Sequence, residues 1–131
     1  MLDALQYMHS REVLHRDLKP ANILLVGDIV KLADFGVSKQ LLLSTCHSAP
    51  AGTWAYMSPE MFEENYNSKS DIWSLGCVFY ELFTLELICG PGAAKLMPHV
   101  RKLGNEEELP NHNEQRYNEI FKKMVDYDVK R

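Results

Sequence analysis

The stretch that decides the fold reads His15-Arg16-Asp17-Leu18-Lys19-Pro20-Ala21-Asn22, and Asp34-Phe35-Gly36 follows it after a short interval. These two segments supply a carboxylate, an ammonium group, an amide and a second carboxylate. Asp17 could accept a proton from a hydroxyl nucleophile, and Lys19 could neutralise a transferring phosphoryl group. Asn22 and Asp34 carry the hard oxygen atoms that Mg²⁺ prefers. The pattern therefore indicates phosphate and magnesium chemistry.

A β-hairpin is predicted between the two segments. Residues 23–26 and 29–33 are apolar runs of strand length, and Gly27-Asp28 between them suits a two-residue turn. Asn22 would stand just before the first strand and Asp34 just after the second. The hairpin would therefore bring the two proposed metal ligands side by side.

Helices are predicted on both sides of this core segment. Leu2, Leu5 and Met8 recur at helical spacing, which predicts a helix over residues 2–9 that ends at Ser10-Arg11-Glu12. A second helix, over residues 72–89, is apolar nearly all round and should be buried as the spine of the fold. Ser68 as N-cap and Asp71 three positions later read as its capping box, and Gly90-Pro91-Gly92 should stop it.

The remaining segments give weaker signals. Residues 37–57 form a polar connection that is too long for a mere connector, and such loops are usually functional or disordered. A helix is predicted around residues 93–103, followed by an acidic loop that ends at Leu109-Pro110. The last predicted helix carries an apolar stripe formed by Ile120, Phe121, Met124 and Val125.

Length and composition restrict the class of protein. With 131 residues the chain is one domain or part of one. A net charge of −4 without a run of Lys and Arg argues against nucleic-acid and membrane partners, and three scattered cysteines cannot pair completely. No basic segment precedes an apolar core at the N-terminus, so no secretory signal is expected. We therefore expect an intracellular protein, cytoplasmic or nuclear.

The two motifs resemble the catalytic loop and the metal-binding motif of the eukaryotic-type serine/threonine protein kinases. The resemblance implies a mainly α fold with a short β-hairpin, that is, the C-lobe of a kinase (α+β) with the N-lobe absent. Residues 1–131 would be a partial kinase domain that contains the catalytic loop, the activation segment and the helices after it. The implied cofactors are ATP and Mg²⁺, and the implied partner is a protein substrate with a Ser or Thr acceptor.

The resemblance also implies roles for the residues that would catalyse the reaction and bind the nucleotide. Asp17 would be the catalytic base, and Lys19 is the residue seen at this place in serine/threonine kinases. Asn22 and Asp34 would bind Mg²⁺ and thereby the nucleotide. Leu24 would form part of the floor under the adenine ring, although as an ordinary strand residue it would belong to the core.

Further residues are implied to have supporting roles. His15 would pack beneath the metal motif, Arg16 would pair with a phosphate on the activation segment, and Phe35 and Gly36 would complete the metal motif as structural residues. Asp71 would accept backbone hydrogen bonds from the catalytic loop, besides or instead of its capping role. Glu60, in Ser58-Pro59-Glu60, would form an ion pair with an arginine. Arg131 stands one position short of the family spacing, so either Arg131 takes this place with a shifted loop or the partner is missing.

The activation segment offers candidates for regulation. Thr53 would contact the base and the lysine, or it is only a turn threonine. Thr45 and Ser48, together with Ser44, are candidate phosphorylation sites, because a phosphate there could pair with Arg16. Cys46-His47 does not make a zinc site, since no second Cys/His pair stands at zinc spacing.

The 131 residues contain no Gly-x-Gly-x-x-Gly loop and no Val-Ala-Ile-Lys strand. In kinases these parts belong to the N-lobe, normally in the same chain, which closes over the nucleotide. We therefore expect little or no kinase activity from this chain alone, and exposed apolar surface where the other lobe would pack. Two hypotheses stay open: part of an active serine/threonine kinase, or a truncated, non-catalytic lobe that acts as a protein-interaction module.

Overall fold

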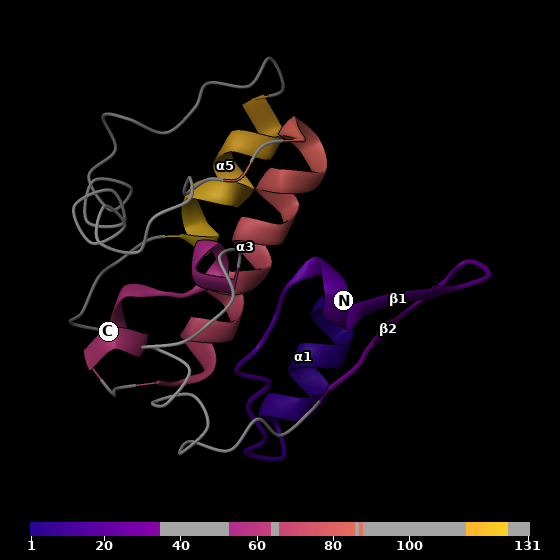
Figure 1. Cartoon of the computed structure of the whole chain (residues 1–131), viewed down its shortest axis with the longest axis vertical. Coiled ribbons are helices and arrows are strands. Elements are labelled where there is room, and N and C mark those ends of the chain that lie inside the picture. Colours follow the sequence, from indigo (N-terminus) through magenta and orange to yellow (C-terminus); the bar gives the residue numbers. More distant parts are fainter. Residues whose placement is uncertain (35–52, 64–65, 86, 88–114, 126–131) are drawn as a thin grey trace.

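The computed structural model describes residues 1–34, 53–63, 66–85, 87 and 115–125. Three α-helices, two strands and three short 3-10 helices lie within these residues: α1 (Leu2–His9), η1 (Pro20–Asn22), β1 (Ile23–Val26), β2 (Ile29–Leu32), η2 (Thr53–Tyr56), η3 (Pro59–Glu63), α3 (Ser68–Thr84) and α5 (Gln115–Met124). Figure 1 shows α3 in the middle, with α1 on one side and α5 on the other. This is the expected mainly α fold with one hairpin.

Helix α3 is the spine of the fold, as its composition predicts. On one side Leu75 packs with Leu5, Met8, Leu18 and Leu32. On the other side a second cluster combines α3 with η2 and α5: Ala55, Tyr56, Trp73, Cys77, Val78, Tyr80, Phe121 and Val125. A Cβ at Gly76 would lie 3.1 Å from the Met124 Cβ and from the Val125 Cγ1, so glycine lets α5 cross close to α3.

Both ends of α3 differ from the sequence prediction. The N-cap is Asn67, not Ser68: the Asn67 side chain accepts the N–H of Lys69 at 2.8 Å, and the Ser70 hydroxyl accepts the N–H of Asn67 at 3.3 Å. Both Asn and Ser are strong N-caps, so the sequence alone does not choose between them. Asp71, predicted as the second member of the box, is instead used in a tertiary contact described below.

The helix also ends at Thr84 rather than at Cys89. Leu85 adopts a left-handed conformation (φ 58°, ψ 23°), and its N–H bonds to the carbonyl of Glu81 at 2.8 Å. This is the usual closing geometry of a helix, but glycine or asparagine normally occupies the position. Nothing in the sequence marks Leu85 as the end. The last turn is open to solvent, since Leu82 and Phe83 are exposed.

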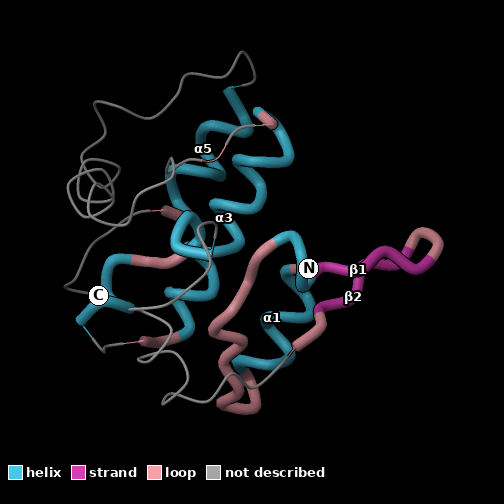
Figure 2. The backbone as a smooth tube through the Cα atoms, viewed as in Figure 1, coloured by secondary structure: helices cyan, strands magenta, loops and turns pink. Residues whose placement is uncertain are grey.

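Helix α1 and the hairpin form as predicted. The helix spans Leu2–His9 with Leu5 and Met8 buried, and a turn over residues 10–12 ends it. The two strands pair antiparallel in the register Ile23↔Leu32 to Val26↔Ile29. Gly27 has a φ of +60° in the two-residue turn, which favours glycine there. In Figure 2 the hairpin extends away from the helices.

Helix α5 confirms the last predicted helix, with one exception in its apolar stripe. Phe121 and Val125 are buried against α3 and Met124 is partly buried, but Ile120 is exposed. The predicted helix around residues 93–103 and its acidic loop lie outside the described residues. Within the described part of the chain, no helix is long and apolar enough to cross a membrane.

Candidate active site

The proposed catalytic loop, residues 15–22, lies between the turn after α1 and the first strand, and a side chain of α3 holds its backbone. The Asp71 carboxylate accepts the N–H of His15 at Oδ2 and the N–H of Arg16 at Oδ1, both at 2.9 Å. These are the hydrogen bonds that the family resemblance implied for Asp71. Arg16 has a φ of +69°, a left-handed conformation that is strained for a residue with a side chain. The buried carboxylate therefore holds the loop backbone in an unusual conformation directly before Asp17.

Three of the predicted site residues meet at one carboxylate. Lys19 Nζ lies 2.8 Å from Asp17 Oδ2, and Asn22 Nδ2 donates to the same oxygen at 2.9 Å. Asn22 Nδ2 also donates to the backbone carbonyl of Asp17 at 2.8 Å. Among the described residues, none donates a hydrogen bond to Asp17 Oδ1, and the side chain is 18% exposed. One oxygen of Asp17 is thus held in place while the other can accept a proton from a ligand.

Asn22 has its amide orientation fixed by these contacts. Both hydrogens of Nδ2 are directed at Asp17, which leaves the amide oxygen Oδ1 as the atom that can bind a cation. The residue is buried in η1, and its backbone carbonyl accepts the N–H of Ala33 at 2.9 Å. That bond extends the β1–β2 ladder by one pair and joins the two ends of the hairpin.

Asp34 follows Ala33 directly and is exposed, with a φ of +60°. The hairpin thus places the backbones of the two proposed metal ligands at neighbouring positions, as predicted. An amide oxygen and one carboxylate fit Mg²⁺, which usually binds few protein groups and keeps water and substrate phosphate as its other ligands. Within the described residues no three His, Cys, Asp or Glu side chains gather into a metal cage. The amide oxygen of Asn22 and the carboxylate of Asp34 are donors that suit a magnesium ion also bound by phosphate.

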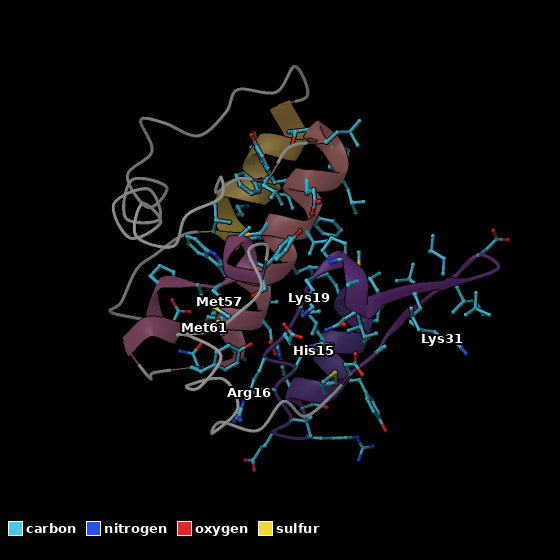
Figure 3. The ribbon with its side chains drawn as sticks, viewed as in Figure 1. His15, Arg16, Lys19, Lys31, Met57 and Met61 are labelled. Atoms are coloured by element: carbon cyan, nitrogen blue, oxygen red, sulfur yellow. The ribbon has the colours of Figure 1, made fainter. Side chains whose placement is uncertain are left out.

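Figure 3 shows His15, Arg16 and Lys19 on the side of the molecule where α1 faces α3, whereas Lys31 lies out along the hairpin. His15 is fully buried, and its Nδ1 lies 3.4 Å from the backbone N of Asp17. The Arg16 guanidinium lies over the ring of Tyr66, with Cζ 5.9 Å from the ring centroid. Thus His15 is directed inward, and Arg16 lies against an aromatic ring.

Other predicted residues take different positions. Leu24 is 48% exposed, so its interpretation as an ordinary core residue is wrong: it lies on β1, in a hairpin that extends from the body (Figure 2). The Glu60 carboxylate accepts the Ser70 hydroxyl at 2.7 Å, which ties η3 to the start of α3. Thr53 begins η2, and its side chain lies outside the described residues. The same holds for Phe35, Gly36, Ser44, Thr45, Ser48 and Arg131.

Sequence reasoning missed two side chains that bind Asp71. His9 Nε2 lies 2.8 Å from Oδ2, and the Tyr66 hydroxyl donates to Oδ1. Burial and the neighbouring carboxylate of Asp71 raise the pKa of the Tyr66 phenol far above its usual range. Burial and Glu81 likewise raise the pKa of Tyr56, whose hydroxyl donates to Glu81 at 2.6 Å. No local motif marks His9, because only the packing of α1 with α3 brings it to Asp71. Tyr66 lies five residues before Asp71, but no capping pattern in the sequence indicates their contact.

The comparison with known proteins agrees with this geometry. The family model described as "Protein kinase domain" matches residues 1–131. The chain is 39% identical to the serine/threonine-protein kinase Nek11 of Mus musculus over 129 residues, 95% of the chain and 20% of the relative. It is 44% identical to the probable serine/threonine-protein kinase nek3 of Dictyostelium discoideum, covering 97% of the chain and 12% of the relative.

A solved structure is similar as well. The crystal structure of Rad53 residues 1–466 in complex with AMP-PNP superposes with a TM-score of 0.71 at 30% identity, covering 95% of the chain and 32% of the solved one. The chain spans about a fifth or less of the length of the two curated relatives above. With a family model that matches throughout and relatives of this identity, the chain belongs to the protein kinase family, and its relatives are serine/threonine kinases.

Proposed function

We propose that these 131 residues provide the catalytic loop and following helices of a C-lobe that transfers the γ-phosphoryl group of ATP to Ser or Thr hydroxyls of proteins. The observation that carries the proposal is the convergence of Lys19 and Asn22 on one oxygen of Asp17. Kinase catalysis needs a carboxylate in a fixed position, because the enzyme acts by positioning and by electrostatic stabilisation. The Asp71 bonds to the loop backbone add to that positioning.

The residues can perform the chemistry as follows. The substrate hydroxyl donates its hydrogen bond to Asp17, and its oxygen attacks the γ-phosphorus in line with the departing oxygen. The bond between the γ-phosphorus and the β–γ bridging oxygen breaks, ADP leaves, and Asp17 takes the hydroxyl proton. Lys19, which already lies 2.8 Å from Asp17, places a positive charge beside the transferring group. No other proton acceptor is needed.

Binding of the nucleotide is assigned to the hairpin side of the site. Asn22 Oδ1 and the exposed carboxylate of Asp34 would hold Mg²⁺, which when bound neutralises charge on the phosphates. Leu24, half-exposed on β1, would lie under the adenine ring. Thr53 would contact the base and the lysine of the loop, and a phosphate on Thr45 or Ser48 would pair with Arg16.

Expression of the protein from its complete coding sequence tests the proposal. With Mg-ATP and a generic Ser/Thr protein substrate, we expect phosphorylation that falls about 10²–10⁴-fold in Asp17→Asn. Asp28→Asn, an exposed aspartate in the hairpin turn, is the matched control and should keep full activity. Transfer that survives in Asp17→Asn, or a protein that phosphorylates nothing, would overturn the proposal.

The 131-residue chain, assayed alone, should be inactive. Its sequence contains neither the glycine-rich loop nor the strand lysine that clamp the phosphates in kinases. Because both lobes of a kinase position the nucleotide, the C-lobe residues alone would leave the phosphates free to move. Magnesium-dependent transfer by the 131-residue chain, abolished by Asp17→Asn, would contradict this statement.

A second candidate function is a non-catalytic interaction module. It is favoured by one observation, the exposed apolar side chains of the hairpin: Leu24, Leu25, Val26, Ile29 and Val30. Partner binding that persists in Asp17→Asn, from a protein without transferase activity, would decide for this function.

A further inference from the structure

Tyr66, which directly precedes the N-cap of α3, makes two contacts that the proposed chemistry does not use, one with Asp71 and one with Arg16 of the catalytic loop. Its hydroxyl donates a hydrogen bond to Asp71 Oδ1. Its ring lies beneath the guanidinium of Arg16, at 5.9 Å from Cζ to the ring centroid. The residue lies far along the chain from the loop, so only the tertiary fold brings the two together.

The Asp71 carboxylate is completely buried and carries a full set of donors. Oδ2 binds His9 Nε2 at 2.8 Å and the N–H of His15 at 2.9 Å, and Oδ1 binds the N–H of Arg16 at 2.9 Å and the Tyr66 hydroxyl. A carboxylate has about four lone-pair directions, so each donor has one. A buried carboxylate that loses a donor is left with an unsatisfied lone pair, and that is costly.

The hydroxyl of Tyr66 therefore acts on the loop through one shared oxygen. Oδ1 is the atom that holds the N–H of Arg16, whose φ of +69° is strained and whose next residue is Asp17. The pKa of the phenol is raised by burial and by Asp71, which keeps the proton on the donor, while the nearby Arg16 backbone N–H and guanidinium act against this rise. If the phenol is removed, Oδ1 can move toward the emptied side and release Arg16.

The ring of Tyr66 has a separate effect. A guanidinium within about 6 Å of a tyrosine centroid is attracted to the face of the ring. Arg16 Nε is buried and has no hydrogen-bond partner among the described residues. The ring of Tyr66 thus contacts the guanidinium of a side chain whose Nε makes no hydrogen bond to the described residues.

We propose that Tyr66 is a positioning residue of the catalytic loop: its hydroxyl, through Asp71, fixes the backbone that carries Asp17, and its ring fixes the guanidinium of Arg16. The kinetic part of this inference rests on the proposed function. The contact itself does not, and it can be measured without catalysis.

Tyr66→Phe and Tyr66→Leu separate the two effects. In the 131-residue chain, ¹H–¹⁵N spectra should show the Arg16 amide proton moving in Tyr66→Phe, because the geometry of its bond to Oδ1 changes. The Arg16 Nε–H signal, shifted upfield by the ring current, should remain in Tyr66→Phe and should lose that shift in Tyr66→Leu. If Tyr66→Phe does not fold, 3-fluorotyrosine at position 66 keeps the ring and alters only the acidity of the hydroxyl, and it should also move the Arg16 amide.

In the protein expressed from its complete coding sequence, Tyr66→Phe should lower kcat about tenfold with the KM for ATP unchanged, a factor that corresponds to about 1.4 kcal/mol. Tyr56→Phe is the matched control, since it removes another tyrosine–carboxylate bond to α3 but leaves the loop alone. Its Arg16 amide should not move.

The possible failures are distinguishable. An Arg16 amide that stays in place in Tyr66→Phe overturns the role of the hydroxyl, and an Nε–H signal that stays in place in Tyr66→Leu overturns the role of the ring. An unchanged kcat in Tyr66→Phe overturns the positioning role even if both signals move. If the wild-type protein transfers no phosphate, the proposed function fails, and the two signals still decide whether Tyr66 holds the loop.

Discussion

The catalytic loop and the β1–β2 hairpin carry the two halves of the proposed site, and they are held in place by opposite means. The loop has no regular structure before η1, yet buried polar contacts from α3 fix it through Asp71. The hairpin is regular, but it extends from the body, and five of its eight strand residues are exposed apolar side chains. The position of Asp17 is thus set by buried contacts in the interior, and that of Asp34 mainly by the hydrogen bonds between β1 and β2.

The largest effect on the free energy of unfolding should come from Asp71→Asn, which changes the side chain that holds the catalytic loop. Four donors are directed at a carboxylate, and an amide group would place its own donors against some of them. We expect the free energy of unfolding to fall by about 3–5 kcal/mol in urea denaturation. Asp3→Asn, on the exposed face of α1, is the control. An unchanged urea midpoint would show that the loop is not held by Asp71.

Substitutions of the two proposed metal ligands should have smaller effects on the free energy of unfolding, and these effects should differ between the two residues. Asn22→Ala removes a buried donor from Asp17, so we expect it to cost about 1–3 kcal/mol of stability. Asp34→Asn changes an exposed side chain and should stay within about 0.5 kcal/mol. Both variants should lose magnesium-dependent transfer in the protein from its complete coding sequence. Equal unfolding free energies would remove the contrast between an anchored and an exposed ligand.

The pH dependence of stability should report Tyr56 and Tyr66, the two tyrosines whose hydroxyls bind carboxylates of α3. A tyrosine whose pKa is raised on folding binds its proton more tightly in the folded state, so its contribution is complete below about pH 10 and is lost as the pH rises further. We expect the slope of this loss to be smaller in Tyr66→Phe, by at most about 1.4 kcal/mol per pH unit. Urea denaturation across this alkaline range measures it, and parallel curves for the two proteins would contradict it.

The smallest effect on stability should come from Leu25→Lys on the hairpin. Leu25 is 75% exposed, so the change should alter the free energy of unfolding by no more than about 0.5 kcal/mol. It should nevertheless reduce the binding of a hydrophobic dye, because it interrupts the exposed apolar side chains of the hairpin. Gln6→Lys, on the exposed side of α1, adds the same charge without removing apolar surface. If both variants bind the dye alike, the hairpin is not the apolar surface that it contacts.

Features that depend on neighbours in the sequence were predictable. The helix at residues 2–9 follows from the spacing of its apolar residues, and the hairpin follows from two short apolar runs around Gly27. Spacing also made Asp17, Lys19 and Asn22 candidates for one site, and the contacts among them are local enough for a single turn to create.

Features that depend on packing could not be predicted from the sequence. Whether Asn67 or Ser68 caps α3, and whether the helix passes Leu85, is a choice between local conformations of similar energy that the surrounding contacts resolve. The exposed face of the hairpin was foreseeable only from the resemblance to a family that has a second lobe.

The sequence by itself determined the chemistry of this protein, because the residue types of the catalytic loop and their spacing define which donors, acceptors and charges are available. Only the tertiary structure decided how that loop is held. Asp71 lies on α3, and His9 and the backbone N–H groups of His15 and Arg16 reach it from a distant part of the chain. A buried carboxylate is stable only with hydrogen-bond donors around it, and the fold supplies them from residues that no local sequence pattern identifies.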